Sequence, residues 1–204
     1  MMLMRGFAYP AKLKLTFCRK QTQLKTGIVN AISGRLILGL LIALAIAGQA
    51  QAEPVSDAVV KTAFLYNFFK FIDWPETIAQ QDYYSLCTTN NDQLGDSLLV
   101  LENKTIHGKP IVTHRGIKDN DLKKCHMIFI GSSENAEAIV RDLEGLPVVT
   151  VSDTLNFIDQ GGMIGLIPSD DRLGFEVNLD VINAGGIHIG AQLLKLAKRV
   201  NKLK

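Results

Sequence analysis

The chain has 204 residues and a formal net charge of +2, but its charges are unevenly distributed. Residues 1–52 hold seven basic side chains and no acidic one, so the remaining 152 residues, with fifteen basic and twenty acidic side chains, carry −5. This balance excludes the basic surface that nucleic-acid binding requires. The length after residue 52 is typical of one domain with one core.

The first 52 residues have the organisation of a secretory signal peptide. A basic segment precedes twelve apolar residues, Leu36 to Ala47, and Ala50-Gln51-Ala52 follows as a small-x-small cleavage site. A spanning helix needs about 20 apolar residues, so this run is short for a membrane anchor. We therefore expect export, cleavage after Ala52 and a mature domain of residues 53–204; the alternative is a retained signal anchor.

The first predicted element of the mature part is a helix that Ser56 or Asp57 caps and that ends before Pro75. Its apolar residues spread over more than the stripe of about 100° that an ordinary surface helix shows. Two explanations stay open. The aromatic residues are part of the core, or some of them form an exposed patch that binds another protein.

The middle of the chain alternates strands and helices. Strands are predicted at 83–89, 109–117, 125–131 and 146–153, and helices at 91–103 and 133–144. The continuous apolar runs indicate strands covered on both faces, and the alternation implies parallel pairing through right-handed crossovers.

The last third has a different pattern. Two short strands, 163–167 and 173–178, surround a turn and predict an antiparallel hairpin, and apolar residues at helical spacing predict a closing helix within 181–204. The expected fold is α/β: a single domain with a mixed, mostly parallel sheet flanked by helices, and a C-terminal hairpin and helix.

Two cysteines, Cys87 and Cys125, remain after the leader, and both lie in strand-like segments. Adjacent strands could bring them within bonding range in an oxidising compartment. The alternative is a pair of buried free thiols.

The sequence gives no catalytic constellation. The four histidines are scattered without metal-ligand spacing, and the glycine-rich segments lack the order of a phosphate-binding loop. We therefore expect neither an enzyme nor a cofactor or metal site.

Four segments carry a resemblance to a known family: "KTAFLYNFFKFIDWP", "KKCHMIFIG", "PVVTVSDTLNFIDQGGMIGLI" and "FEVNLDVINAGGIHIGAQLLKLAKRV". In this order and spacing they are similar to the YfiR family of periplasmic proteins. The resemblance implies an α/β domain, often dimeric, that represses an inner-membrane diguanylate cyclase by binding its periplasmic portion. It also implies release by an outer-membrane, peptidoglycan-associated lipoprotein, with cyclic di-GMP and biofilm formation as the output.

The resemblance also implies roles for particular residues. Cys87 and Cys125 fall where the family places a strand-linking disulfide. The partner-facing positions correspond to Phe157, Phe175, Glu176 and Ile182. Core packing is the alternative role of each. Glu176 is the most informative of the four, because a glutamate between two strand hydrophobes should point to solvent or to a partner. We expect Glu176→Lys or Phe157→Ala to leave the fold intact and to raise cellular cyclic di-GMP.

Other functions compete with this one. An α/β domain could hold an aromatic metabolite near the glycine-rich turns and act as a periplasmic small-ligand sensor. The membrane partner could also be a different sensor, such as a histidine kinase, and the apolar first helix makes a homodimer an expected state.

Overall fold

An eight-stranded sheet organises the part of the chain that the computed structural model describes, residues 56–169 and 172–201. The predicted signal peptide lies outside these residues. The sheet has the strand order β10-β8-β7-β6-β5-β2-β4-β3, and a separate pair joins β1 to β9. The strands are β1 Ile72–Asp73, β2 Tyr84–Thr88, β3 Thr105–Ile106, β4 Lys109–His114, β5 Met127–Ile130, β6 Val149–Ser152, β7 Ile164–Ser169, β8 Arg172–Asn178, β9 His188–Ile189 and β10 Arg199–Asn201.

Short helices connect these strands. The α-helices are α2 Asp57–Phe71, α3 Glu76–Ala79, α4 Ala136–Asp142, α5 Leu179–Ala184 and α6 Ala191–Leu194. The 3-10 helices in the described ranges are η1 Gly95–Leu101, η2 Asp119–Lys124 and η3 Phe157–Gln160. None of the helices in the described ranges is long and apolar enough to span a membrane.

The centre of the sheet is parallel. Strands β4, β2, β5, β6 and β7 pair in parallel with their neighbours, whereas β7 and β8 form an antiparallel hairpin and β3 pairs antiparallel with β4. The last strand, β10, pairs parallel with β8. The predicted α/β class with a mixed, mostly parallel sheet and a C-terminal hairpin is therefore confirmed.

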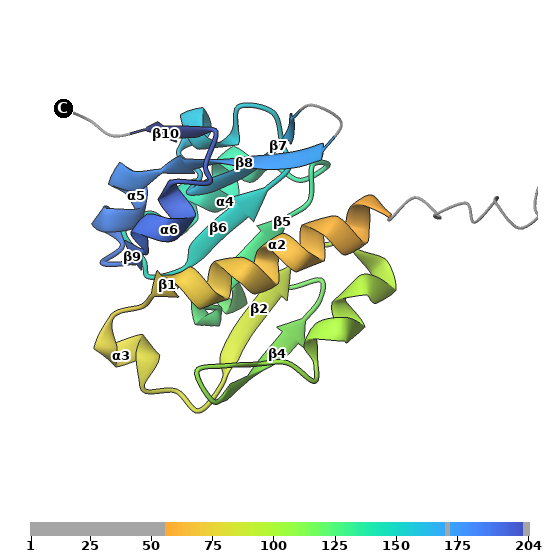
Figure 1. Ribbon diagram of the computed structural model, residues 1–204, viewed down its shortest axis with the longest axis vertical. Coiled ribbons are helices and arrows are strands. Elements are labelled where there is room, and N and C mark those ends of the chain that lie inside the picture. Colours follow the sequence, from red (N-terminus) through yellow and green to blue (C-terminus); the bar gives the residue numbers. More distant parts are fainter. Residues whose placement is uncertain (1–55, 170–171, 202–204) are drawn as a thin grey trace, which may run out of the picture. The chain divides into compact units, whose positions relative to one another are not determined.

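Both faces of the sheet are covered, which explains the continuous apolar strands. In β5, Met127 and Phe129 pack in the core beneath α2, whereas Ile128 and Ile130 pack in a second core with Val140 of α4. Figure 1 shows α2 lying across one face of the sheet, with α4 behind it. Successive strand residues point to opposite faces, so each strand needs apolar residues at every position.

Burial in the core accounts for the apolar surface of α2. The Ser56 side chain accepts a hydrogen bond from the backbone N–H of Val59 and caps the helix, as predicted. Leu65, Phe68 and Phe69 are fully buried. The helix packs on the sheet and also contacts η1 and α6, so a wider arc of its circumference is buried than in a helix that meets one layer.

The C-terminal segment differs from its prediction. One closing helix was expected within 181–204, whereas the chain forms two short helices, α5 and α6, and the strands β9 and β10 there. Glycines end the helical path: a Cβ on Gly185 would lie 2.7 Å from the carbonyl oxygen of Leu146, and Gly186 has a φ of +68°. The chain then turns back so that β9 pairs with β1 and β10 extends the sheet.

Candidate functional site

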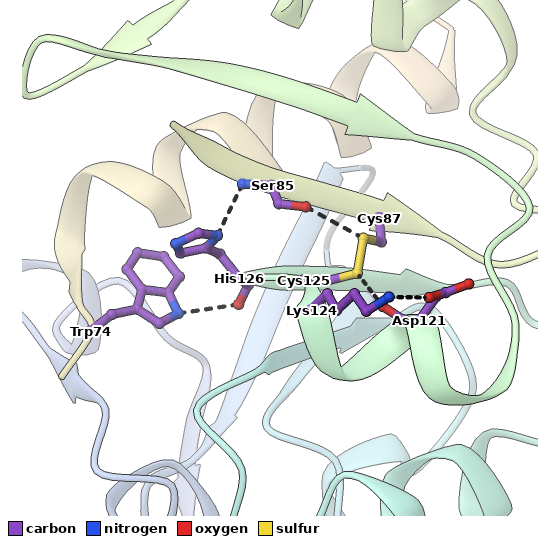
Figure 2. Close-up of a disulfide and its surroundings, with 7 residues drawn as sticks. All are labelled: Trp74, Ser85, Cys87, Asp121, Lys124, Cys125 and His126. Carbon is purple, nitrogen blue, oxygen red and sulfur yellow. Dashed lines mark hydrogen bonds and ion pairs between the residues drawn. A yellow bond between two sulfur atoms is a disulfide. The ribbon is translucent and has the colours of Figure 1, made fainter. Parts of the chain in front are cut away.

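A disulfide joins the two strands at the centre of the sheet. Cys87 lies in β2 and Cys125 lies two residues before β5, and these strands are parallel neighbours. The two Cα atoms are 6.0 Å apart, within the range of a disulfide, and the sulfur atoms are bonded (Figure 2). Both residues are buried. The predicted bond is confirmed, and the free-thiol alternative is excluded.

Polar groups surround the disulfide. The Ser85 hydroxyl lies 3.6 Å from Sγ of Cys87, and Sγ of Cys125 lies 3.6 Å from the backbone oxygen of Asp121. The Lys124 ammonium donates to the Asp121 carboxylate at 2.7 Å, which lowers the pKa of Asp121 and raises that of Lys124. A cavity of about 230 Å³ borders these residues. The bond is thus buried just beneath a polar surface.

His126 follows the disulfide and is buried among aromatic rings. Its Nδ1 accepts a hydrogen bond from the backbone N–H of Ser85 at 3.0 Å, and its carbonyl oxygen accepts one from Nε1 of Trp74 at 3.1 Å. The rings of Trp74 and Tyr84 pack edge-on against the imidazole. Burial lowers the pKa of His126, and the backbone of Ile78 only partly opposes this effect. The imidazole is therefore a neutral structural group that links β1–α3, β2 and β5.

The four predicted partner-facing residues lie in three different elements. Phe157 begins η3, Phe175 and Glu176 are in β8, and Ile182 is in α5. The exposed fractions of Phe157, Phe175 and Ile182 are 1%, 3% and 0%. Only Glu176 reaches the surface, with a side chain that is 17% exposed.

The two aromatic residues pack on opposite faces of the sheet. Phe175 contacts the rings of Phe64 and Phe68 of α2, at centroid distances of 5.9 and 5.3 Å. Phe157 belongs to the second core, and its ring lies directly on the backbone of Gly162, where a Cβ would be 2.3 Å from it. Truncating a buried phenylalanine to alanine typically costs about 3–5 kcal/mol. The structure therefore revises the expectation that Phe157→Ala is neutral for the fold.

Glu176 takes part in an ion-pair cluster that the sequence did not reveal. Arg199 of β10 donates to both carboxylate oxygens of Glu176 at 3.0 and 2.8 Å and to both of Asp159 at 2.8 and 2.7 Å. We call these three residues the arginine clamp. The clamp connects β10, β8 and η3 at the surface. Hydrogen bonds from Arg199 lower the pKa of Asp159, and the two carboxylates raise that of Arg199.

Three exposed apolar residues lie near the clamp residues in the sequence. Leu196 lies three residues before Arg199, Val200 follows it, and Leu155 lies two residues before η3; all three are exposed. Arg199 lies within the segment for which the sequence predicted a closing helix, so its forked contact with two carboxylates could not be anticipated. The structure thus brings Glu176 together with Asp159 and Arg199 at the surface, whereas Phe157 and Phe175 are buried in the two cores.

A buried ion pair holds the N-terminal end of α2 to the sheet. The Lys61 ammonium donates to Oδ2 of Asp153, after β6, at 2.6 Å, and it also contacts Asp57 one helical turn earlier. Burial lowers the pKa of Lys61, but these bonds outweigh it and the net shift is upward. Within the described ranges, no group of three or more His, Cys, Asp or Glu residues could hold a metal ion.

A family model supports the relationship that the sequence segments indicated. The model described as YfiR/HmsC-like matches residues 58–198, from the first turn of α2 to the residue before β10. The match includes the disulfide, two residues of the clamp and all four predicted partner-facing residues.

Proposed function

Because the chain belongs to the YfiR/HmsC-like family, we propose that it is a periplasmic regulatory protein without catalytic activity of its own. In this proposal it represses an inner-membrane diguanylate cyclase, or a similar membrane sensor, by binding the periplasmic domain of that protein. An outer-membrane lipoprotein releases the repression by capturing the regulator. The observation that carries the proposal is the family match over 58–198.

The repression follows from linkage between binding and conformation. A ligand shifts a two-state equilibrium only by its differential affinity for the two states. A regulator that binds the inactive state of a membrane cyclase more tightly therefore lowers its activity, and a competitor for the same surface restores it. This mechanism needs a specific surface and no reactive group.

We place that surface around the arginine clamp. Glu176 provides the contact at the surface, and the buried side chains of Phe157, Phe175 and Ile182 support it by fixing η3, β8 and α5. In this proposal Leu155, Leu196 and Val200, which are exposed and near the clamp residues in the sequence, add contact area. Charged groups at such a position select a partner and set its orientation more than they increase affinity.

The test is a charge reversal at Glu176. Glu176→Lys removes one carboxylate from Arg199 and leaves Asp159 as its partner, so the melting temperature should stay within about 4 °C of wild type, as for a surface ion pair. Cellular cyclic di-GMP, measured in cells that carry the cognate cyclase, should rise several-fold because the regulator no longer binds.

Glu137→Lys is the matched control. It reverses the charge of an exposed glutamate that pairs with Arg141 at 3.0 Å on α4, and it should leave cyclic di-GMP unchanged. If a folded Glu176→Lys protein keeps cyclic di-GMP at the wild-type level, the clamp is not the contact surface. If deletion of the whole gene also leaves the nucleotide unchanged, the proposed repression itself is refuted.

A further inference from the structure

The order of the parallel strands reverses around β2. The chain passes from β2 to β4 on one side of the sheet and then crosses to β5 on the other side of β2. Figure 1 shows the arrowheads of β2, β4 and β6 pointing to the same end of the sheet. In open α/β sheets, ligands bind outside the carboxyl ends of the strands where the strand order reverses. The loops after β2 and its neighbours are therefore the first place to look for a ligand.

The loops at this end surround two hollows. A cleft of about 520 Å³ lies between the loop after β2 and the loop after β4. A second hollow of about 330 Å³ borders the same β2 loop, and the two share Thr89 and Asn90. The volume of the cleft falls within the range of about 300–1,000 Å³ that small-molecule sites occupy. We name the larger one the switch cleft.

The lining of the switch cleft defines its chemistry. Its lining residues are Asn90, Asn91, Gln93 and Arg115, together with Thr89, Asp92 and two glycines. Among the described residues, no aliphatic or aromatic side chain lines this cleft. The lining therefore favours a hydrophilic ligand with hydroxyl groups.

The β2 loop is held in one conformation. Thr89 Oγ1 accepts a hydrogen bond from the backbone N–H of Gly131, and Asn91 and Gln93 have left-handed φ angles of 58° and 56°. The carbonyl oxygen of Asn91 lies so close to Gly131 that a Cβ there would be 2.6 Å from it. Such conformations persist only where the surroundings enforce them. The backbone of the β2 loop is thus positioned before any ligand arrives.

Arg115 is the cation of the switch cleft. Its side chain is 51% exposed, and its guanidinium lies 3.5 Å from Oδ1 of the buried Asp92. Asp92 is already satisfied, because Oδ1 accepts from the backbone N–H of Leu94 at 2.8 Å and Oδ2 from Thr88 Oγ1 at 2.5 Å. The carboxylate therefore orients Arg115 without occupying all five of its N–H donors. The remaining donors suit an oxyanion.

We propose that the switch cleft binds a small polyhydroxylated oxyanion, such as a sugar phosphate or a sugar acid. Arg115 binds the phosphate or carboxylate group, and the carboxamides of Asn90, Asn91 and Gln93 bind the hydroxyl groups. The site lies in loops that contain no clamp residue. Its occupancy is therefore a property independent of the proposed repression.

The experiment is isothermal titration calorimetry of the purified protein with four probes: glucose 6-phosphate, glucuronate, glucose and inorganic phosphate. Saturable binding of at least one anionic sugar, with glucose inactive and inorganic phosphate weaker, supports the proposal. The two anionic sugars distinguish a phosphate from a carboxylate ligand. Equal binding of inorganic phosphate and the anionic sugars would overturn the role of the carboxamides. If none of the four probes shows saturable binding up to about 10 mM, the site itself is overturned.

The variants Arg115→Gln and Arg141→Gln locate the binding. Loss of the charged hydrogen bonds in Arg115→Gln should weaken binding about 10- to 100-fold. Arg141 is a matched control because it is an exposed arginine paired with a carboxylate on α4, and its variant should bind like wild type. Equal affinity of Arg115→Gln and wild type would refute the assignment, and circular dichroism verifies that both variants are folded.

Discussion

Removal of the disulfide is the change whose effect on stability can be calculated most directly. Cys87 and Cys125 are separated by 38 positions, and in the chain-entropy model a bond that closes a loop of this length stabilises the fold by about 4 kcal/mol. For a domain of this size each kcal/mol corresponds to about 2–4 °C in melting temperature. We therefore expect reduction of the wild-type protein to lower the melting temperature by roughly 8–16 °C.

Two comparisons separate the cross-link from packing. Reduced wild type keeps both sulfur atoms and loses only the bond, whereas the double variant Cys87→Ala, Cys125→Ala also loses buried volume and should melt slightly lower than reduced wild type. The double variant should not respond to reductant. Melting is followed by circular dichroism with and without a phosphine reductant, after thiol labelling has verified complete reduction. A shift below about 2 °C in fully reduced wild type would refute the loop-entropy reasoning.

Two further predictions concern buried charged or titratable groups. His126 is held neutral, and protonation of Nδ1 would break its bond with Ser85; stability should therefore fall as the pH drops below about 6.5, where the unfolded chain binds a proton that the folded chain does not. Urea denaturation between pH 7 and 5 should show a shallower decline for His126→Asn, and an unchanged slope would contradict this role. Lys61→Met leaves the largely buried carboxylate of Asp153 without its cation and should cost about 3 kcal/mol in unfolding free energy. The double variant Lys61→Met, Asp153→Asn should regain part of that unfolding free energy. If its loss of unfolding free energy equals the sum of the losses of the two single variants, the two residues are not coupled.

Local patterns in the sequence were sufficient to predict most of the strands. The continuous apolar run at 125–131 corresponds to β5, and the alternation of strands and helices gave the parallel centre of the sheet. Because Cys87 and Cys125 both lie in strand-like segments, a disulfide between adjacent strands was one of two alternatives that the sequence left open. These features depend on side-chain periodicity and on chain connectivity, which are properties of short segments.

The C-terminal segment needed tertiary information. Apolar residues at helical spacing predicted one helix, but the segment forms two short helices and two strands. Gly185 fits closely against the carbonyl oxygen of Leu146, and β10 gains a hydrogen-bonding neighbour in β8. Contacts with residues distant in sequence outweighed the local helical preference, which amounts to less than about 1 kcal/mol per residue for ordinary residues.

The candidate site was also only partly predictable from the sequence. Sequence segments placed Phe157, Phe175, Glu176 and Ile182 in the order expected of the family, but an aromatic residue in a strand is equally compatible with a core and with an interface. Only the packing of three layers decided that the two rings lie inside, on opposite faces of the sheet, while Glu176 meets Arg199 at the surface.

The sequence by itself determined most of the strand segments and the family, and it leads us to expect a signal peptide in residues 1–52. The tertiary structure decided which side chains remain accessible, because exposure depends on the layers that cover each residue. It also brought Arg115 to the β2 loop and Arg199 to two carboxylates, because strand pairing joins positions that no local pattern relates.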